Sequence, residues 1–483
     1  MLKSKFFLFG GSILLFLTNL IVFLRLPHVV WIPSFVGTWL TSKGLIYYRD
    51  FIQTHFPLSH LVVYPFLKLF NWNLEVEPFF SFFILILTLI FIYLINRSVS
   101  LSRKGFWVSG IFFSTLYWYF STWVQYSQEA LIGLVLTIVF LLLIKACSNR
   151  TIPKNKLFFI GLLLSFAQLS GQVASPTVIV FIISILFMLK IKLSGKKEFL
   201  NNIFIFALGI LLPLMAICVY FLIKGALGDF YYWNIPYYLI YSKLSQARPG
   251  ILPIKDIVLF YLPPLILIFS LLTAKWKIGG FPKKILLILC ISTIPSVIFS
   301  VFHPHHFLFG LPLISLSWVY ILRDGRNKRL DNIFLLSAIF VTGYLLYSKY
   351  FWYQDKLKFA SPTINLSRVT ENDTQSETIA WLNKNSTLSD RIIVVGDPVL
   401  YYRADRLPAN KYFSVLPWHY LPLDQTAVEF TNKRPNFWVI DNLYKKRLIT
   451  SWKSPEILKF IENQLLNYKI VYKNTEWEIW KKI

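Results

Sequence analysis

The sequence is poor in cysteine, in acidic residues and in charge altogether. Its 483 residues include 3 cysteines and 23 aspartates and glutamates, and charged residues make up 15% of the chain. The cysteines (Cys147, Cys218 and Cys290) lie in or beside apolar segments without CxxC spacing, so neither a disulfide framework nor a zinc centre is expected. Soluble domains carry about a quarter charged residues. This scarcity therefore excludes a soluble cytoplasmic enzyme, a secreted disulfide scaffold and a disordered chain.

Hydrophobic residues are abundant instead, at 56% of the chain, with 45 Phe and 26 Tyr. A water-soluble core could not bury so many, so the composition predicts an α-helical polytopic membrane protein. The hydrophobic pattern predicts about eleven spans. They lie near residues 6–24, 78–95, 106–120, 129–146, 157–171, 173–189, 202–223, 257–274, 285–301, 306–322 and 332–349.

The basic residues predict the orientation of these spans. The net charge is +26, and Lys and Arg gather in alternate loops between apolar runs, which places these loops in the cytoplasm. They lie near 97–104, 145–156, 190–197, 275–284 and 323–329. Lys3 and Lys5 precede the first run, which is too long for a signal-peptide core, so we expect an uncleaved anchor with a cytoplasmic N-terminus. Since the positive charges follow the membrane pattern, nucleic acid is not an expected partner.

Residues 157–189 form one long apolar stretch with basic residues at both ends. As a single helix it would be about 50 Å long, whereas the hydrocarbon core of a bilayer is roughly 30 Å thick. We therefore expect two antiparallel helices with a turn at Gly171 and Pro176.

Three stretches are expected outside the membrane: 27–77, 225–256 and about 350–483. Aromatic, Pro and charged residues in the first favour helices that lie in the membrane interface. The last has mixed charge, with helices expected at 374–385 and 454–467 and strands at 391–396, 437–441 and 468–472. The predicted organisation is a transmembrane domain, 1–349, whose loop 27–77 holds the active site, and a small extracytoplasmic α/β domain, 350–483.

Several short motifs follow one another along the chain. They are Gly44, Tyr48–Phe51, Pro57, Gln128–Glu129, His303–Pro312, Asp390–Ile392 and Tyr401–Tyr402. With these motifs the chain resembles the polytopic GT-C glycosyltransferases of the protein O-mannosyltransferase and aminoarabinose-transferase type. The resemblance implies transfer of one sugar, with inversion, from a polyprenyl-phosphate donor to a hydroxyl of a lipid, glycan or protein on the outer face of the cell membrane.

One departure from the family pattern changes the expected catalytic residue. Family members usually carry an acidic residue just after the first span, but residues 26–35 contain no carboxylate and offer only His28. Nor does an arginine open the second span, where Glu75, Glu77 and Pro78 stand instead. Three alternatives remain: Asp50 takes the catalytic role, His28 substitutes, or the chain is a diverged or inactive member.

Sugar transfer from a polyprenyl phosphate needs a base for the acceptor hydroxyl and cations for the departing phosphate. Asp50 is the candidate catalytic base, because partial desolvation at an interface would raise the pKa of its carboxyl. The alternative is that Asp50 pairs with Arg49 or Lys43, or caps a helix. Contacts to the sugar or phosphate are expected from a second set of residues: His28, Arg49, His55, Glu129, Lys243, Arg248, His303, His305 and His306.

Simpler roles are open for several of these residues. The histidines near 303–306 and the aromatic loop 225–256 fit anchoring at the membrane interface, and Glu129 fits a carboxylate at a helix N-terminus. The histidines lack a fourth ligand with metal spacing, so no metal or cofactor is expected, with a divalent cation left open. A lipid or polysaccharide transporter or flippase and an inactive scaffold are the rival functions.

Overall fold

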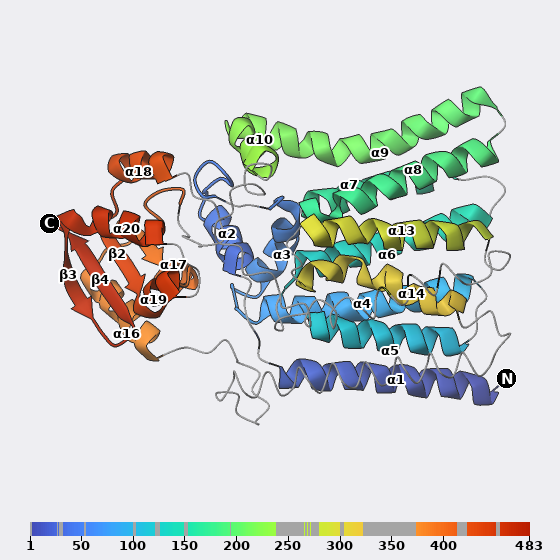
Figure 1. The fold of residues 1–483 in the computed structure, drawn as a ribbon, viewed down its shortest axis with the longest axis horizontal. Helices are drawn as coiled ribbons and strands as arrows, with labels where there is room; N and C mark the ends of the chain where they lie inside the picture. Colours follow the sequence, from blue (N-terminus) through green and yellow to red (C-terminus); the bar gives the residue numbers. More distant parts are fainter. Residues whose placement is uncertain are drawn as a thin grey trace. The chain divides into compact units, whose positions relative to one another are not determined.

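The computed structural model describes residues 2–26, 28, 32–52, 55–99, 103–120, 126–148, 153–193, 195–237, 265, 268, 271, 280–299, 304–321, 373–412, 423–450 and 455–483 (Figure 1). The chain forms two compact units. The bundle unit comprises Met1–Val29, Glu75–Ile217 and Leu252–Arg368, and the sheet unit comprises Val30–Leu74, Cys218–Ile251 and Val369–Ile483. The first outer loop therefore groups with the C-terminal region and not with the spans that flank it.

The bundle unit is helical. Its elements are α1 (Leu2–Arg25), α4 (Val76–Ser98), α5 (Arg103–Phe120), α6 (Gln128–Ser148), α7 (Lys154–Ser170), η1 (Gln172–Ala174), α8 (Ser175–Lys192), most of α9 (Lys196–Ile223), α13 (Gly280–Phe299), η2 (Pro304–Phe309) and α14 (Leu311–Ile321). Four stretches are long and apolar enough to cross a membrane: Val76–Ser98, Gln128–Cys147, Gln172–Lys192 and Lys196–Ile223. The chain is thus a multi-pass membrane protein. Of the expected spans, 332–349 lies outside the described residues and 257–274 almost wholly so.

The long apolar stretch at 157–189 forms a helical hairpin, as the sequence predicts. Helix α7 ends at Ser170, Gly171 follows as its C-cap, and α8 begins at Ser175 with a proline in its first turn. The Lys192 ammonium at the end of α8 donates to the Ala146 carbonyl oxygen at 2.8 Å, near the end of α6. The turn at Gly171 lies instead near Ile132, close to the start of α6. Helix α8 therefore runs parallel to α6.

Helices α7 and α9 approach each other closely at two glycines. A Cβ added to Gly161 would lie 2.4 Å from the Phe206 carbonyl oxygen, and one added to Gly209 would lie 2.2 Å from the Phe158 carbonyl oxygen. No larger residue fits either position without separating the helices. Packing of this kind replaces the hydrophobic effect, which cannot hold helices together in lipid.

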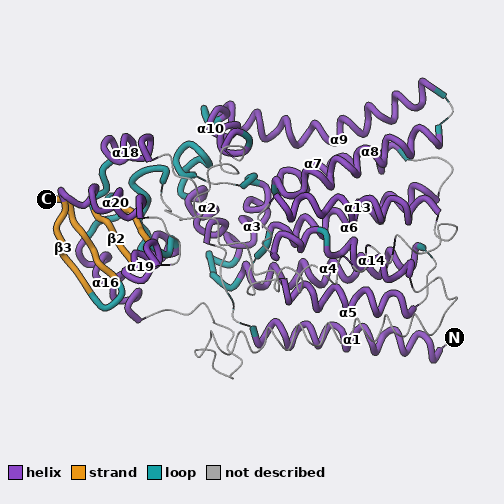
Figure 2. The backbone as a smooth tube through the Cα atoms, viewed as in Figure 1, coloured by secondary structure: helices purple, strands orange, loops and turns teal. Residues whose placement is uncertain are grey.

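The sheet unit contains all the strands among the described residues (Figure 2). Its helices are α2 (Ile32–Ser42), α3 (Leu58–Leu69), α10 (Leu227–Asn234), α16 (Asp373–Asn385), α17 (Val399–Arg403), α18 (Leu423–Asn432), α19 (Asn442–Thr450), α20 (Pro455–Gln464) and η3 (Leu465–Asn467). The strands are β1 (Ile392–Val395), β2 (Phe437–Asp441), β3 (Tyr468–Lys473) and β4 (Trp477–Lys482), in the order β1-β2-β4-β3. Strands β1 and β2 are parallel, and β4 is antiparallel to β2 and β3.

The small α/β domain expected at the C-terminus is therefore present, and the strands and helices expected there are confirmed. Strand β4 was missed. Its sequence, WEIWKK, mixes charge with aromatics, and only pairing on both sides with β2 and β3 defines it as a strand.

The first outer loop packs within the sheet unit. The Ile52 amide donates to the Lys411 carbonyl oxygen at 2.9 Å, and the Tyr402 hydroxyl donates to the Trp72 carbonyl oxygen at 2.9 Å. The Phe35 ring lies 4.9 Å from that of Tyr402, edge to face. Because loop 32–74 and the C-terminal domain share these contacts, a membrane cannot separate them.

Candidate functional site

Asp50 and Arg49 lie in the sheet unit, in a tight turn at residues 46–51. One Asp50 oxygen accepts from Arg49 Nε at 2.9 Å, and the other accepts from Arg49 Nη2 and from the Ile46 amide, each at 2.9 Å. The Arg49 Nη1 group also donates to the Lys224 carbonyl oxygen at 2.9 Å. Tyr48, the preceding residue, is buried at φ 69°, a conformation that non-glycine residues rarely adopt. The carboxylate of Asp50 thus holds the turn together.

The expected direction of the Asp50 pKa was wrong. Burial by itself would raise it, as expected from the sequence, but the hydrogen bond from Arg49, the Ile46 amide and the charge of Arg49 together lower the pKa of Asp50. The Arg49 hydrogen bond likewise raises the pKa of Arg49 itself. A carboxylate with a lowered pKa is a weaker proton acceptor. The alternative role of Asp50, pairing with Arg49, is therefore observed.

The other sequence-predicted residues divide among three places. His55 is half-buried in the sheet unit, where its carbonyl oxygen accepts from the Tyr48 hydroxyl at 2.7 Å. His28, Glu129 and His306 lie in the bundle unit. Lys243, Arg248 and His303 lie outside the described residues, and of His305 only the backbone, in η2, is described.

His28 contacts an acidic residue that is distant in sequence. It is buried just after α1, and its Nδ1 lies 2.6 Å from Glu75 Oε2, at the N-cap of α4. Its Nε2 lies 3.1 Å from the Phe23 carbonyl oxygen. A carbonyl oxygen only accepts, so an Nε2–H group donates to it, while Nδ1 faces the carboxylate. Both ring nitrogens are thus occupied, and the pair joins the end of α1 to the start of α4.

Glu129 and His306 form a second pair, at the start of α6. His306 Nδ1 lies 3.0 Å from Glu129 Oε1, and the Ser127 hydroxyl donates to Glu129 Oε2 at 2.7 Å. The Glu129 side chain is 4% exposed and the His306 side chain 15%. Glu129 lies in the first turn of α6, where the helix dipole is positive. The tertiary fold therefore brings together two sequence-predicted residues that are 177 positions apart.

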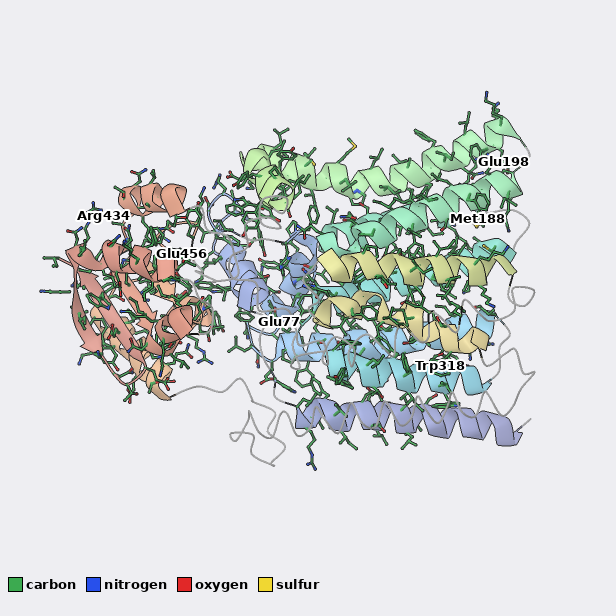
Figure 3. All side chains as sticks on the ribbon, viewed as in Figure 1. Glu77, Met188, Glu198, Trp318, Arg434 and Glu456 are labelled. Carbon is green, nitrogen blue, oxygen red and sulfur yellow. The ribbon has the colours of Figure 1, made fainter. Side chains whose placement is uncertain are left out.

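Tyr126 and Glu77 adjoin the second pair. Both side chains are buried, at 1% and 0% exposure. Burial, followed by the negative charges of Glu77 and Glu129, raises the pKa of Tyr126 well above its ordinary value. Figure 3 labels Glu77 at one end of the bundle and Glu198 at the other. The sequence analysis mentioned Glu77 only because it stands where related proteins have an arginine, and it did not select Tyr126 or Ser127. Ser127 could have been found, because a serine directly before a helix is a capping signal.

We call His28, Glu75, Glu77, Tyr126, Glu129 and His306 the carboxylate–histidine end of the bundle. Such groups can accept a proton and can hydrogen-bond the hydroxyls of a sugar, but three carboxylates would repel a phosphate. In the described part of the chain, no group of three or more His, Cys, Asp or Glu side chains converges as a metal site. The described geometry thus fits proton transfer and sugar binding better than phosphate binding.

No protein-family model matches the sequence, and no curated protein matches it. Solved structures do match. ArnT from Cupriavidus metallidurans bound to undecaprenyl phosphate has 11% identity and a TM-score of 0.57, covering 98% of both chains. The archaeal oligosaccharyltransferase AglB from Archaeoglobus fulgidus, in complex with an inhibitory peptide and a dolichol-phosphate, has 10% identity and a TM-score of 0.56, covering 99% of this chain and 74% of AglB.

A third match is the arabinofuranosyltransferase AftD from Mycobacteria, with 12% identity and a TM-score of 0.55. The match covers 99% of this chain and 41% of AftD, so the chain spans about two-fifths of that protein. The chain therefore has the fold of the GT-C glycosyltransferases over nearly its full length, which confirms the resemblance seen in the sequence.

Proposed function

We propose that this protein is a membrane glycosyltransferase that moves one sugar from a polyprenyl-phosphate carrier to an acceptor hydroxyl on the outer face of the membrane. The full-length fold similarity supports the reaction class, since ArnT binds undecaprenyl phosphate and AglB a dolichol-phosphate in the matched structures. The single observation that carries the proposal is the carboxylate–histidine end of the bundle. Buried ionisable groups in a membrane protein are costly and therefore indicate function.

The positions of the charges argue against a transporter. A transporter that moves a polar substrate is expected to place ionisable residues at mid-span. In the described helices of the bundle unit, Asp, Glu, Lys, Arg and His all lie within about two turns of a helix end. Glu77 and Glu129 argue against an inactive scaffold. Both are buried beside Tyr126, so they would not contribute to a surface that binds a partner.

The sidedness of the reaction follows from the charge pattern of the loops. Basic loops on the cytoplasmic side leave the starts of α4 and α6 outside, together with His306 in η2. The acceptor is proposed to be a lipid, glycan or protein, and membrane lipids would surround the spans. The sequence predicts Asp50 as the catalytic base. Its described contacts favour a structural role instead, because both Asp50 oxygens are already hydrogen-bonded.

A reconstitution experiment tests the proposed function. The purified full chain is placed in vesicles with a radiolabelled short-chain polyprenyl-phosphate sugar and with lipid, glycan and peptide acceptors. Several donors are tested, each with a different sugar. We expect label to leave the lipid-phosphate fraction and to join one acceptor class. Label that crosses the bilayer while it stays on its carrier would support the flippase, and a wild-type protein that moves no label at all would reject the transferase.

A further inference from the structure

Three aromatic rings from α16, β2 and β3 meet on one face of the β-sheet. The Trp381 ring lies 5.6 Å from that of Tyr472 and 6.3 Å from that of Phe437, the latter edge to face. Phe437 is buried, whereas Trp381 and Tyr472 are half-buried. These two rings therefore leave part of their surface open to solvent. Aromatic rings offer a large, flat apolar contact area, which suits the C–H face of a sugar ring.

Two exposed lysines lie directly opposite each other on the same face of the sheet. Lys469 on β3 pairs with Lys481 on β4, and Lys481 pairs in turn with Phe437 on β2. Side chains of directly paired residues point to the same side of a sheet, so both lysines share this side with the three rings. The Lys481 ammonium lies 5.7 Å from the centre of the Phe437 ring. Like charges that face each other across two strands destabilise a sheet.

The charges of these two lysines are not compensated within the described part of the chain. No carboxylate there forms an ion pair with either ammonium. Lys473, on the same strand, differs: it binds Glu478 at 2.7 Å, and the two side chains lie on the opposite face. An anion bound between two cations relieves their repulsion. We call five residues the aromatic–lysine face: Trp381, Phe437, Lys469, Tyr472 and Lys481.

We propose that the aromatic–lysine face binds an anionic glycan, a chain of sugars that carries phosphate or carboxylate groups. A sugar ring packs on Trp381 and Tyr472, and the anionic group of the glycan binds between Lys469 and Lys481. This binding does not depend on the proposed transfer reaction. The further step, that this glycan is the acceptor of the sugar, rests on the proposed function.

Two other anionic partners fit this face less well. A membrane surface binds through cations together with apolar side chains that enter the lipid, but Ile470, the exposed apolar residue of β3, pairs with Trp480 and so lies on the opposite face. An acidic peptide would bind the lysines but has no need of open aromatic rings. The combination of charge with flat rings therefore favours the glycan.

The test measures binding to the full chain in phosphatidylcholine nanodiscs, without any donor. The probes are neutral dextran, phosphorylated dextran and carboxymethyl dextran of equal length. We expect an anionic dextran to bind at least about tenfold more tightly than neutral dextran, and less tightly as salt is added. The double change Lys469→Gln and Lys481→Gln should weaken this binding roughly tenfold. Lys473→Gln removes the same charge from the opposite face and is the matched control, with a change of less than about twofold.

Trp381→Leu separates a glycan from other polyanions, because it keeps an apolar side chain but removes the ring. We expect it to weaken the binding of the anionic dextran roughly fivefold and to leave that of polyglutamate unchanged. Thermal unfolding shows whether each variant folds, and Tyr472→Leu takes its place if Trp381→Leu does not.

Three results would overturn the inference while the transferase stands. They are no binding of either anionic dextran, equal binding of polyglutamate with no effect of Trp381→Leu, and tighter binding to phosphatidylglycerol vesicles than to the dextrans. A protein that binds the anionic dextran but transfers no sugar to any acceptor overturns the proposed function and the acceptor role, and leaves the glycan-binding face.

Discussion

The turn at residues 46–51 should depend on the charge of Asp50. Asp50→Asn removes the ionic contact with Arg49 and replaces one of its two acceptor oxygens with a donor. Hydrogen bonds to charged groups contribute about 1.5–3 kcal/mol each, whereas ion pairs at the surface contribute about 0–1 kcal/mol. The Arg49 side chain is 43% exposed and the Asp50 side chain 25%. Because water screens the exposed Arg49 side chain, we expect Asp50→Asn to lower the free energy of unfolding by roughly 1–2 kcal/mol.

The sign of the pH dependence follows from the lowered pKa of Asp50. A carboxyl that binds its proton less tightly in the folded protein than in the unfolded chain stabilises the fold above its ordinary pKa. That stabilisation is lost as the pH falls through the lowered value. The difference between wild type and Asp50→Asn should therefore be full at neutral pH and shrink below about pH 4.

The assay is thermal unfolding in detergent at a series of pH values, for wild type, Asp50→Asn, Arg49→Gln and the double variant. The two single changes should be non-additive, because each removes the same contact. Sugar transfer by Asp50→Asn should fall less than about tenfold, whereas loss of a catalytic base costs roughly 10²–10⁴-fold. Unchanged stability at neutral pH, or a stability difference that persists at the lowest pH, would refute the structural role of Asp50.

Three further substitutions test the packing of the two units. Gly161→Ala and Gly209→Ala should weaken the contact of α7 with α9 and lower the unfolding temperature, although alanine favours a helix by about 1 kcal/mol over glycine. Gly228→Ala serves as the control, because a Cβ at Gly228 meets nothing within 4 Å. An unchanged unfolding temperature in Gly161→Ala and Gly209→Ala would contradict the close contact. Lys43→Met removes the 2.7 Å ion pair with Asp405; the Lys43 side chain is 39% exposed and the Asp405 side chain 51%. It should change the unfolding free energy by less than about 1 kcal/mol, measured by denaturant titration, and a larger loss would show that the pair is more than a surface contact.

Patterns of residues that are neighbours in sequence predicted much of the fold. The hairpin of α7 and α8 followed from the length of an apolar stretch, from the basic residues at its ends and from Gly171, all of which are neighbours in sequence. The strands β1, β2 and β3 followed from their runs of hydrophobic residues. Strand β4 and the grouping of loop 32–74 with the C-terminal domain did not, because both depend on partners distant in sequence.

The candidate site shows the same division. Composition and the spacing of apolar runs sufficed for a helical multi-pass membrane protein, since partition into lipid depends on each segment by itself. The fold itself was expected only from the resemblance of short motifs to a known family. Residue type also indicated Glu129 and His306 as polar groups at helix ends. Only the packing of helices in three dimensions brings Glu129 and His306 into contact. The same packing places the Glu75 carboxylate beside His28, although residues 26–35 contain no carboxylate. Proton affinity depends on such neighbours: the contacts of Asp50 with Arg49 and the Ile46 amide reversed the direction expected for its pKa.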